Sequence, residues 1–279
     1  MIGEHRRARA FVGAGSAGPF GRAYRIQLSL GVLFPGLRGR LGRTLALLLM
    51  AFTAWARAGE PLVTSERSAT LRSLFAPEEI AALAKTMPPD QTVRFRVWWS
   101  EARNPGVLVF VSPTDSGEPP AGWLALLQQK QLSWIAADGF GNEELVAQRV
   151  LVAVMGLALA QRSATLDRKR IYVGGMSGGG RIASMTAPRF PEMFSGGLYI
   201  VGANFWIPDD ARLKQLAAAN RYVFITGERD FNHNDVNRVF SRYRSNGLNS
   251  SLLMDLPGYG HEYPNVEQLG QAIDFLDAH

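Results

Sequence analysis

The 279-residue sequence contains no cysteine and only four histidines. Without a thiol, the chain can form no disulfide and hold no thiolate-bound metal. The histidines show no H-x-x-H spacing, so the sequence predicts no metal site, and nothing in it implies a cofactor. The missing disulfides leave export open, because disulfides are permitted outside the cytoplasm without being required there.

Acidic side chains are nearly absent from residues 1–58, which contain nine Lys or Arg residues and one acidic residue. Residues 59–279 contain 21 Lys or Arg and 23 Asp or Glu residues, so the net charge of +6 comes from the N-terminal part. A nucleic-acid-binding domain would carry its positive charge on the folded body. We therefore expect no nucleic-acid partner, a leader over 1–58 and a single domain over 59–279.

Residues 38–58 have the pattern of a signal peptide. A basic start precedes an apolar stretch over 45–55, and small residues in an A-x-A pattern end at Ala58. The stretch is too short to span about 30 Å of hydrocarbon, so we expect no stable membrane anchor. The pattern predicts cleavage between Ala58 and Gly59 and a periplasmic or secreted protein, with a buried amphipathic helix as the alternative. Residues 1–37 would then be disordered or an over-extended start.

Beyond the leader, apolar runs typical of strands alternate with helix-like segments. The expected strands cover 91–100, 107–112, 132–137, 170–175, 196–202, 221–227 and 250–256. Helices are expected from 76, over 121–131, over 143–161 and from 179. Repeated β-α units of this kind predict an α/β domain with a mostly parallel central sheet and helices on both faces.

One serine stands in an unusually glycine-rich turn, IYVGGMSGGGRIAS, at residues 171–184. Residues 175–179 fit the G-x-S-x-G pattern, in which the serine occupies a strained turn between a strand and a helix. The first N–H groups of such a helix suit the oxyanion that forms when an acyl carbonyl is attacked. Ser177 is therefore a candidate nucleophile. The alternative is a glycine-rich turn in which the serine is incidental.

A serine nucleophile needs a histidine base, and the histidine needs an orienting carboxylate. His261 follows the last expected strand in the loop PGYGHEYP, whereas His233 precedes a helix. Asp230 follows another strand end in FITGERD, where Glu228 and Asp235 are the competing carboxylates. We predict His261 as the base and Asp230 as the orienting acid.

The order Ser177, Asp230, His261 is the nucleophile–acid–base order of α/β-hydrolases. The motifs GGMSGGG, TGERDFN and PGYGHEYP fall at strand ends, and through them residues from about 91 to 279 resemble the α/β-hydrolase superfamily. Within it, they look like the branch of bacterial secreted polyhydroxyalkanoate depolymerase-like and feruloyl-esterase-like esterases. The resemblance implies an α/β-hydrolase fold.

The resemblance also implies an oxyanion hole and a substrate cleft. One oxyanion donor would be the N–H of Gly178 and the other an N–H in VFVSPTD, where Pro113 has none, so Thr114 is expected. Residues 203–220 leave no room for a large cap domain, which predicts an open site. Side chains expected near the substrate, several of which could equally be core residues, are Phe140, Met176, Phe205, Trp206, Phe231 and Tyr259.

These features predict an exported serine hydrolase that cleaves carboxylic esters through an acyl-enzyme. Its substrate would be a small-molecule or oligomeric ester, with aryl or polyester-like compounds favoured by an open aromatic cleft. A serine peptidase of the prolyl-oligopeptidase type is the nearest alternative, although no extra domain fits before residue 91. A non-catalytic binding protein with a hydrolase-like fold is the alternative from another class.

Overall fold

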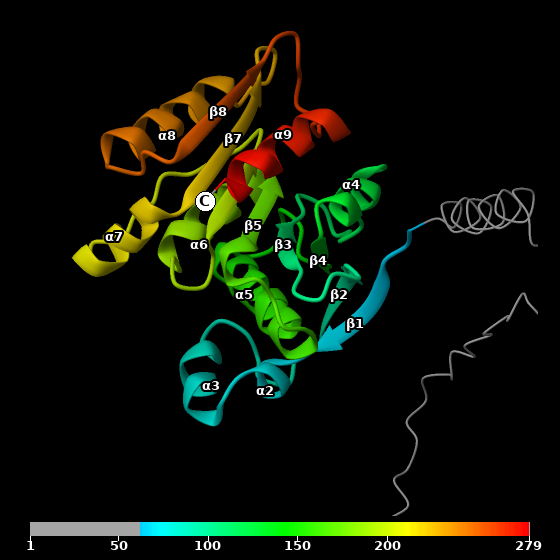
Figure 1. Ribbon diagram of the computed structural model, residues 1–279. Helices are drawn as coiled ribbons and strands as arrows, with labels where there is room; N and C mark the ends of the chain where they lie inside the picture. Colours follow the sequence, from blue (N-terminus) through cyan, green and yellow to red (C-terminus); the bar gives the residue numbers. More distant parts are fainter. Residues whose placement is uncertain (1–61, 279) are drawn as a thin grey trace, which may run out of the picture. The chain divides into compact units, whose positions relative to one another are not determined.

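A computed structural model of the protein describes residues 62–278, which contain an eight-stranded sheet (Figure 1). The leader and signal peptide expected over 1–58 lie outside the described residues. The strands are β1 (Ser65–Ala69), β2 (Val93–Trp98), β3 (Gly106–Val111), β4 (Leu132–Asp138), β5 (Ile171–Met176), β6 (Gly196–Ile200), β7 (Arg221–Gly227) and β8 (Ser251–Leu256). The helices are α2 (Leu71–Leu74), α3 (Pro77–Leu83), α4 (Trp123–Gln129), α5 (Val146–Ser163), α6 (Gly178–Arg189), α7 (Ala211–Ala219), α8 (His233–Ser245) and α9 (Val266–Asp277).

The strand order is β1-β2-β4-β3-β5-β6-β7-β8. Strands β3 to β8 pair in parallel, whereas β2 is antiparallel to both β1 and β4. The predicted mostly parallel sheet is confirmed. The sheet begins earlier than the expected first strand, because β1, with the polar sequence SERSA, forms an exposed edge next to β2.

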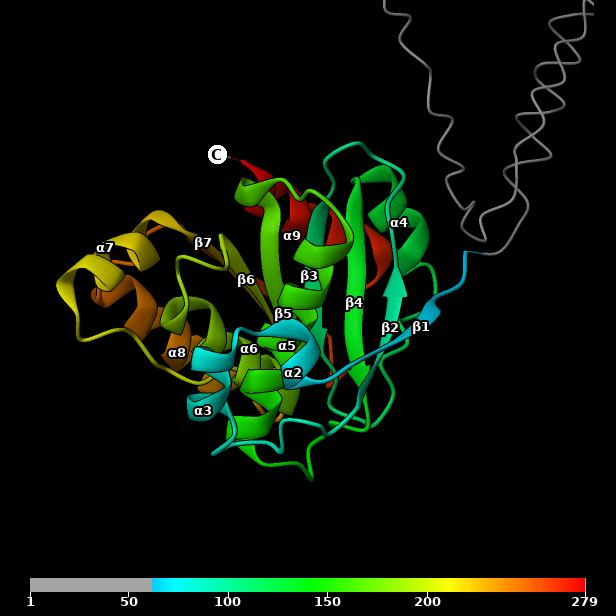
Figure 2. The same ribbon diagram turned by 90° about the horizontal axis from the view of Figure 1, so that it is seen from below.

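Helices cover both faces of the sheet, as predicted (Figure 2). Successive strand residues point to opposite faces, so Val107, Val109 and Val111 contribute to the core beneath α5, α6 and α8. Leu108 and Phe110 belong to the second core, beneath α4 and α9. The strand over residues 107–112 reads as a continuous apolar run because both of its faces are buried.

The loops after the parallel strands meet at one edge of the sheet, the edge formed by the C-terminal ends of these strands. Open α/β sheets bind their ligands there. Strands β5, β7 and β8 all end at this edge. Between β6 and β7 the described chain contains only α7, so no large cap covers the edge from this connection. Within residues 62–278, no helix has the length and apolar character needed to cross a membrane.

At the opposite edge, where the parallel strands begin, Asp277 at the end of α9 bonds this helix to the sheet. Its carboxylate accepts hydrogen bonds from Arg170 Nε at 2.8 Å and Nη2 at 2.7 Å, and from the Tyr172 hydroxyl at 2.7 Å. Burial, followed by the hydrogen bond to Asp277, raises the pKa of Tyr172 well above its usual value. The tyrosine is thus a neutral hydrogen-bond donor at neutral pH.

We predict that Asp277→Ala lowers the free energy of unfolding by about 2–3 kcal/mol, because Arg170 and Tyr172 lose a charged acceptor. Asp274 lies on the same helix and pairs with Lys130 at the exposed surface. Asp274→Ala should therefore cost less than about 1 kcal/mol. Urea-induced unfolding of both variants measures the difference, and equal losses would contradict the assignment.

Candidate active site

Ser177 occupies a strained turn between β5 and α6. Its φ of 54° and ψ of −120° lie outside the regions that residues other than glycine normally occupy. Strain of this kind costs about 1–3 kcal/mol and persists only where neighbouring structure fixes it. Here the Ser177 N–H donates to the carbonyl oxygen of Ile200 at 2.8 Å, and the Ser177 carbonyl accepts from Arg181 N at 3.1 Å.

The glycines around Ser177 allow backbone segments to touch. A Cβ at residue 175 would lie 2.4 Å from the carbonyl carbon of Gly179, and one at residue 179 would lie 1.9 Å from the Val111 oxygen. Any side chain at these positions would push β5, α6 and the end of β3 apart. Met176 has room for a side chain because it points away, into the core beneath α4 and α9.

Asp230 and His261 are paired at the same edge of the sheet. His261 Nδ1 lies 2.7 Å from Asp230 Oδ1, which also accepts the N–H of Asn232 at 3.1 Å. The Asp230 side chain is 0% exposed, and among the described residues its Oδ2 has no partner. Because Nδ1 is used on the carboxylate, Nε2 of His261 is available for another partner. The Ser177 hydroxyl makes no hydrogen bond within residues 62–278, and catalytic hydrogen bonds are often long without substrate.

A series of contacts connects Ser177 to the loop that carries Asp230. Residue 202 is glycine, and a Cβ there would lie 2.2 Å from the Ser177 carbonyl oxygen. The neighbouring Val201 carbonyl accepts from Asn232 Nδ2 at 2.8 Å. Asn232 Oδ1 in turn accepts from Arg181 Nη2 at 2.8 Å. The sequence analysis missed Arg181 and Asn232, because their roles depend on contacts between distant segments.

The competing residues have other partners. His233 Nε2 lies 2.9 Å from Asp255 Oδ2. Glu228 accepts the N–H of Gly258 at 2.9 Å, and Asp235 pairs with Arg238 on α8. Each of these interactions occupies a side chain that could otherwise have joined the site.

Phe231 covers one face of the His261 ring. The two rings stack with their centroids 4.2 Å apart and their planes inclined by 25°. Phe231 is 78% exposed, which is unusual for a large apolar side chain. Its position between Asp230 and Asn232 places this exposed ring next to the imidazole.

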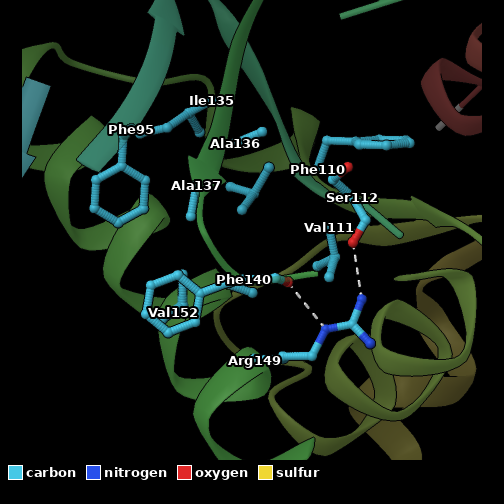
Figure 3. A pocket seen from close by; sticks show the side chains of 12 residues that line it. Phe95, Phe110, Val111, Ser112, Ile135, Ala136, Ala137, Phe140, Arg149 and Val152 are labelled. Atoms are coloured by element: carbon cyan, nitrogen blue, oxygen red, sulfur yellow. Dashed lines mark hydrogen bonds between the residues drawn. The ribbon is translucent and has the colours of Figure 1, made fainter. Parts of the chain in front are cut away.

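Three other predicted substrate residues have different surroundings. Phe140 lines an internal pocket with Phe95 and Val152, as Figure 3 shows, and it packs against the core. Trp206 lines a mostly apolar pocket of about 510 Å³ bordered by α5 and α6. Neither pocket includes Ser177, Asp230 or His261 among its lining residues.

Tyr259 connects neighbouring loop segments through hydrogen bonds. Its hydroxyl donates to the Tyr263 carbonyl, and its own carbonyl accepts the N–H of Arg229 at 2.8 Å. The second contact joins the loop after β8, which carries His261, to the loop after β7. The structure therefore gives no support for Phe140, Trp206 or Tyr259 as substrate contacts.

The two predicted oxyanion donors have different surroundings. Gly178 is the first residue of α6, directly after the nucleophile candidate. The N–H of Thr114, in contrast, donates to Ser112 Oγ at 3.2 Å, and the two hydroxyls are 3.1 Å apart. Thr114 thus already has an acceptor inside its own loop.

We predict that Gly202→Ala destabilises the protein by about 1–3 kcal/mol, because its Cβ would collide with the Ser177 carbonyl. Gly270→Ala provides the matched control, since the nearest atom to its Cβ, Leu126 Cδ1, would be 3.7 Å away. Alanine in a helix interior favours folding by about 0.5–1 kcal/mol over glycine. Thermal unfolding should shift downward for the first variant and not for the second; a neutral Gly202→Ala would show that the turn can relax.

Comparison with known proteins identifies the fold. No protein-family model and no curated protein sequence matches the chain. A solved ferulic acid esterase matches 77% of this chain and 98% of its own, with a TM-score of 0.54 and 14% identity. An arylesterase matches 78% and 87%, with a TM-score of 0.53 and 14% identity.

A third solved structure, the acylaminoacyl peptidase of Pyrococcus horikoshii, matches 79% of this chain but only 41% of its own, with a TM-score of 0.55 and 13% identity. Identities this low establish a shared fold and leave the chemistry to the residues of the site. The strand order and these matches agree, and the chain has the α/β-hydrolase fold.

Proposed function

We propose that the protein is a serine hydrolase that cleaves carboxylic esters through an acyl-enzyme. The observation that carries the proposal is the buried Asp230 carboxylate bound to His261 Nδ1 at 2.7 Å, at the sheet edge where Ser177 sits with a φ of 54°. A paired base and a strained serine after β5 are the parts that acyl transfer requires. The ferulic acid esterase and arylesterase matches support the same reaction class.

In this mechanism, His261 Nε2 accepts the Ser177 hydroxyl proton while Oγ attacks the ester carbonyl carbon. Asp230 holds the imidazole through Nδ1 and stabilises the imidazolium that forms. The carbonyl oxygen becomes an oxyanion and accepts a hydrogen bond from the Gly178 N–H at the start of α6. Collapse of this intermediate breaks the ester bond, and His261 gives its proton to the departing alcohol. Water then repeats the sequence on the acyl-enzyme and releases the acid.

The site favours aryl or extended esters over small enclosed ones. Among the described residues, α7 is the only helix between β6 and β7, so this connection provides no cap. The exposed Phe231 ring offers an apolar face beside His261. A small-molecule aryl ester or an oligomeric polyester chain could lie across such an edge without being enclosed.

Peptide cleavage is the second candidate, because the matched acylaminoacyl peptidase has the same fold. The chain spans less than half of that protein's length, and amide bonds expel a poorer leaving group than esters do. A binding protein without catalysis is the third candidate. It would tolerate loss of Ser177, Asp230 or His261 with its ligand affinity intact.

We predict that Ser177→Ala and His261→Ala each lower kcat for p-nitrophenyl butyrate by about 10³-fold or more. His233→Ala is the matched control, because that histidine pairs with Asp255 and should leave the rate unchanged. A fluorophosphonate probe should label the wild type and His233→Ala but not Ser177→Ala.

The same assay separates the alternatives. Esters should be cleaved much faster than matched aminoacyl anilides, and the reverse order would favour a peptidase. Feruloyl or other aryl esters should exceed short aliphatic esters in kcat/KM, and the opposite preference would remove the aryl proposal. A folded wild type that neither turns over nor labels would favour a binding protein.

We also propose that the chain is exported and that its signal peptide is removed between Ala58 and Gly59. The basic start, the apolar stretch over 45–55 and the A-x-A pattern support this. The first described strand, β1, begins at Ser65, so cleavage there would leave the sheet intact.

We predict that the full chain expressed in a bacterium yields a periplasmic or secreted protein. Its mass should be that of a chain that begins at Gly59. Leu48→Arg, which breaks the apolar stretch, should keep the protein in the cytoplasm at its uncleaved mass. Ile26→Arg lies before that stretch and should leave processing unchanged. Mass spectrometry of the cell fractions decides, and an uncleaved cytoplasmic wild type would contradict the proposal.

A further inference from the structure

In the loop after β3, the N–H that the sequence offers as a second oxyanion donor already has an acceptor. Pro113 has no N–H, and the N–H of Thr114 donates to Ser112 Oγ at 3.2 Å. Removing one oxyanion donor typically costs 10²–10³ in kcat, so a working site needs a second donor from somewhere. The neighbouring loop, after β4, supplies a side chain in the right place.

Asn142 lies directly against the residue that follows the nucleophile. A Cβ at residue 178 would stand 2.1 Å from Asn142 Oδ1 and 3.1 Å from Asn142 Nδ2. The carboxamide is exposed, and within residues 62–278 it has no hydrogen-bond partner. A half turn about its terminal torsion exchanges the oxygen and the NH₂ group, so Nδ2 can face the same space.

The backbone around Asn142 is held firmly to the loop after β3. The Asn142 N–H donates to the Pro113 carbonyl at 3.0 Å, and the Gly141 N–H donates to Asp115 Oδ1 at 3.1 Å. A Cβ at residue 141 would stand 2.8 Å from the carbonyl carbon of Thr114. The two loops therefore form one unit at the edge of the sheet.

Arg149 donates hydrogen bonds to both loops of this unit, as Figure 3 shows. Its Nη2 donates to the Ser112 carbonyl at 2.8 Å and its Nε to the Phe140 carbonyl at 3.2 Å. The residue is 4% exposed, and among the described residues it forms no ion pair with a carboxylate. Burial lowers the pKa of its guanidinium. It also lies in the first turn of α5, where the helix dipole disfavours a cation.

Burial and the position in the first turn of α5 both disfavour the positive charge of Arg149. The residue therefore has a role that offsets this energetic cost. Both of its acceptors belong to the loops that flank Gly178 and Asn142.

We propose that the Asn142 carboxamide is the second oxyanion donor, working with the Gly178 N–H, and that Arg149 is a positioning residue for it. This inference rests on the proposed ester hydrolysis. Asn142 would donate Nδ2–H to the oxyanion and release it when the tetrahedral intermediate collapses. The loop after β4 thus replaces the occupied N–H of Thr114.

The first test uses Asn142→Ala, Asn142→Asp and the neighbouring Glu143→Ala as control. Asn142→Ala should lower kcat by about 10²–10³-fold with KM within about twofold, because the donor acts mainly in the transition state. Asn142→Asp keeps the shape but replaces the donor with a negative charge, so its loss should be larger. Glu143→Ala, at an exposed position of the same loop, should match the wild type.

The second test uses Arg149→Met, with Arg162→Met as control. Arg162 lies on the same helix and donates to the Leu74 carbonyl at 2.9 Å, away from the site. Arg149→Met should lower kcat and accelerate amide hydrogen exchange in residues 112–117, and Arg162→Met should do neither. The double variant with Asn142→Ala should lose little more than Asn142→Ala alone, because both act through one donor.

The outcomes separate this inference from the proposed function. If the wild type hydrolyses esters and Asn142→Ala equals it, the donor assignment is overturned while ester hydrolysis stands. If losses in the double variant multiply, Arg149 does not act through Asn142. If the wild type is inert and unlabelled, ester hydrolysis and the donor fall together. Should Arg149→Met fail to fold, the Asn142 variants decide alone.

Discussion

The close contact between backbone segments around Ser177 is the constraint on which the site depends. The Ser177 carbonyl fits against residue 202, and the carbonyl of Val111 fits against residue 179, only because both residues are glycines. These contacts bring the ends of β3, β5 and β6 together at one point. The strain in the Ser177 backbone is maintained because the surrounding sheet and helix have no room to relax. The lack of side chains at these glycines therefore does more to fix the position of the Ser177 hydroxyl than attractive contacts do.

Two buried charged residues, Asp230 and Arg149, lie in different parts of the site. Asp230, after β7, is held by the Asn232 N–H and by His261, whereas Arg149 is held by two carbonyl groups of the loops after β3 and β4. Acyl transfer would create an imidazolium beside Asp230, whose fixed charge is opposite in sign. Arg149 holds the loops after β3 and β4 in place through their carbonyl groups. A site arranged in this way needs little reorganisation during the reaction.

Local patterns predicted the sheet well, and they pointed to Asp230 and His261, whose side chains lie 2.7 Å apart. The glycine-rich turn, the strand before it and the loops PGYGHEYP and FITGERD are contiguous in sequence and keep their local geometry in the fold. Strand β1 was missed because an exposed edge strand such as SERSA has no apolar alternation to reveal it. The surroundings of Phe140 depend on distant segments. Its ring lines a pocket with Phe95 and Val152, and its carbonyl accepts a hydrogen bond from Arg149, contacts that no local pattern encodes.

The order of the strands decides which loop can complete the oxyanion hole. In the sequence, β4 follows β3, but in the sheet β3 lies between β4 and β5, with the nucleophile turn at the end of β5. The loops after β3 and β4 are therefore neighbours of the turn and of each other. The first loop holds Pro113, and its Thr114 N–H already has an acceptor, whereas the second loop brings Asn142 against Gly178. Residues whose placement depends on strand order cannot be found by reading the chain in one direction, which is why Asn142 becomes visible only in the folded protein.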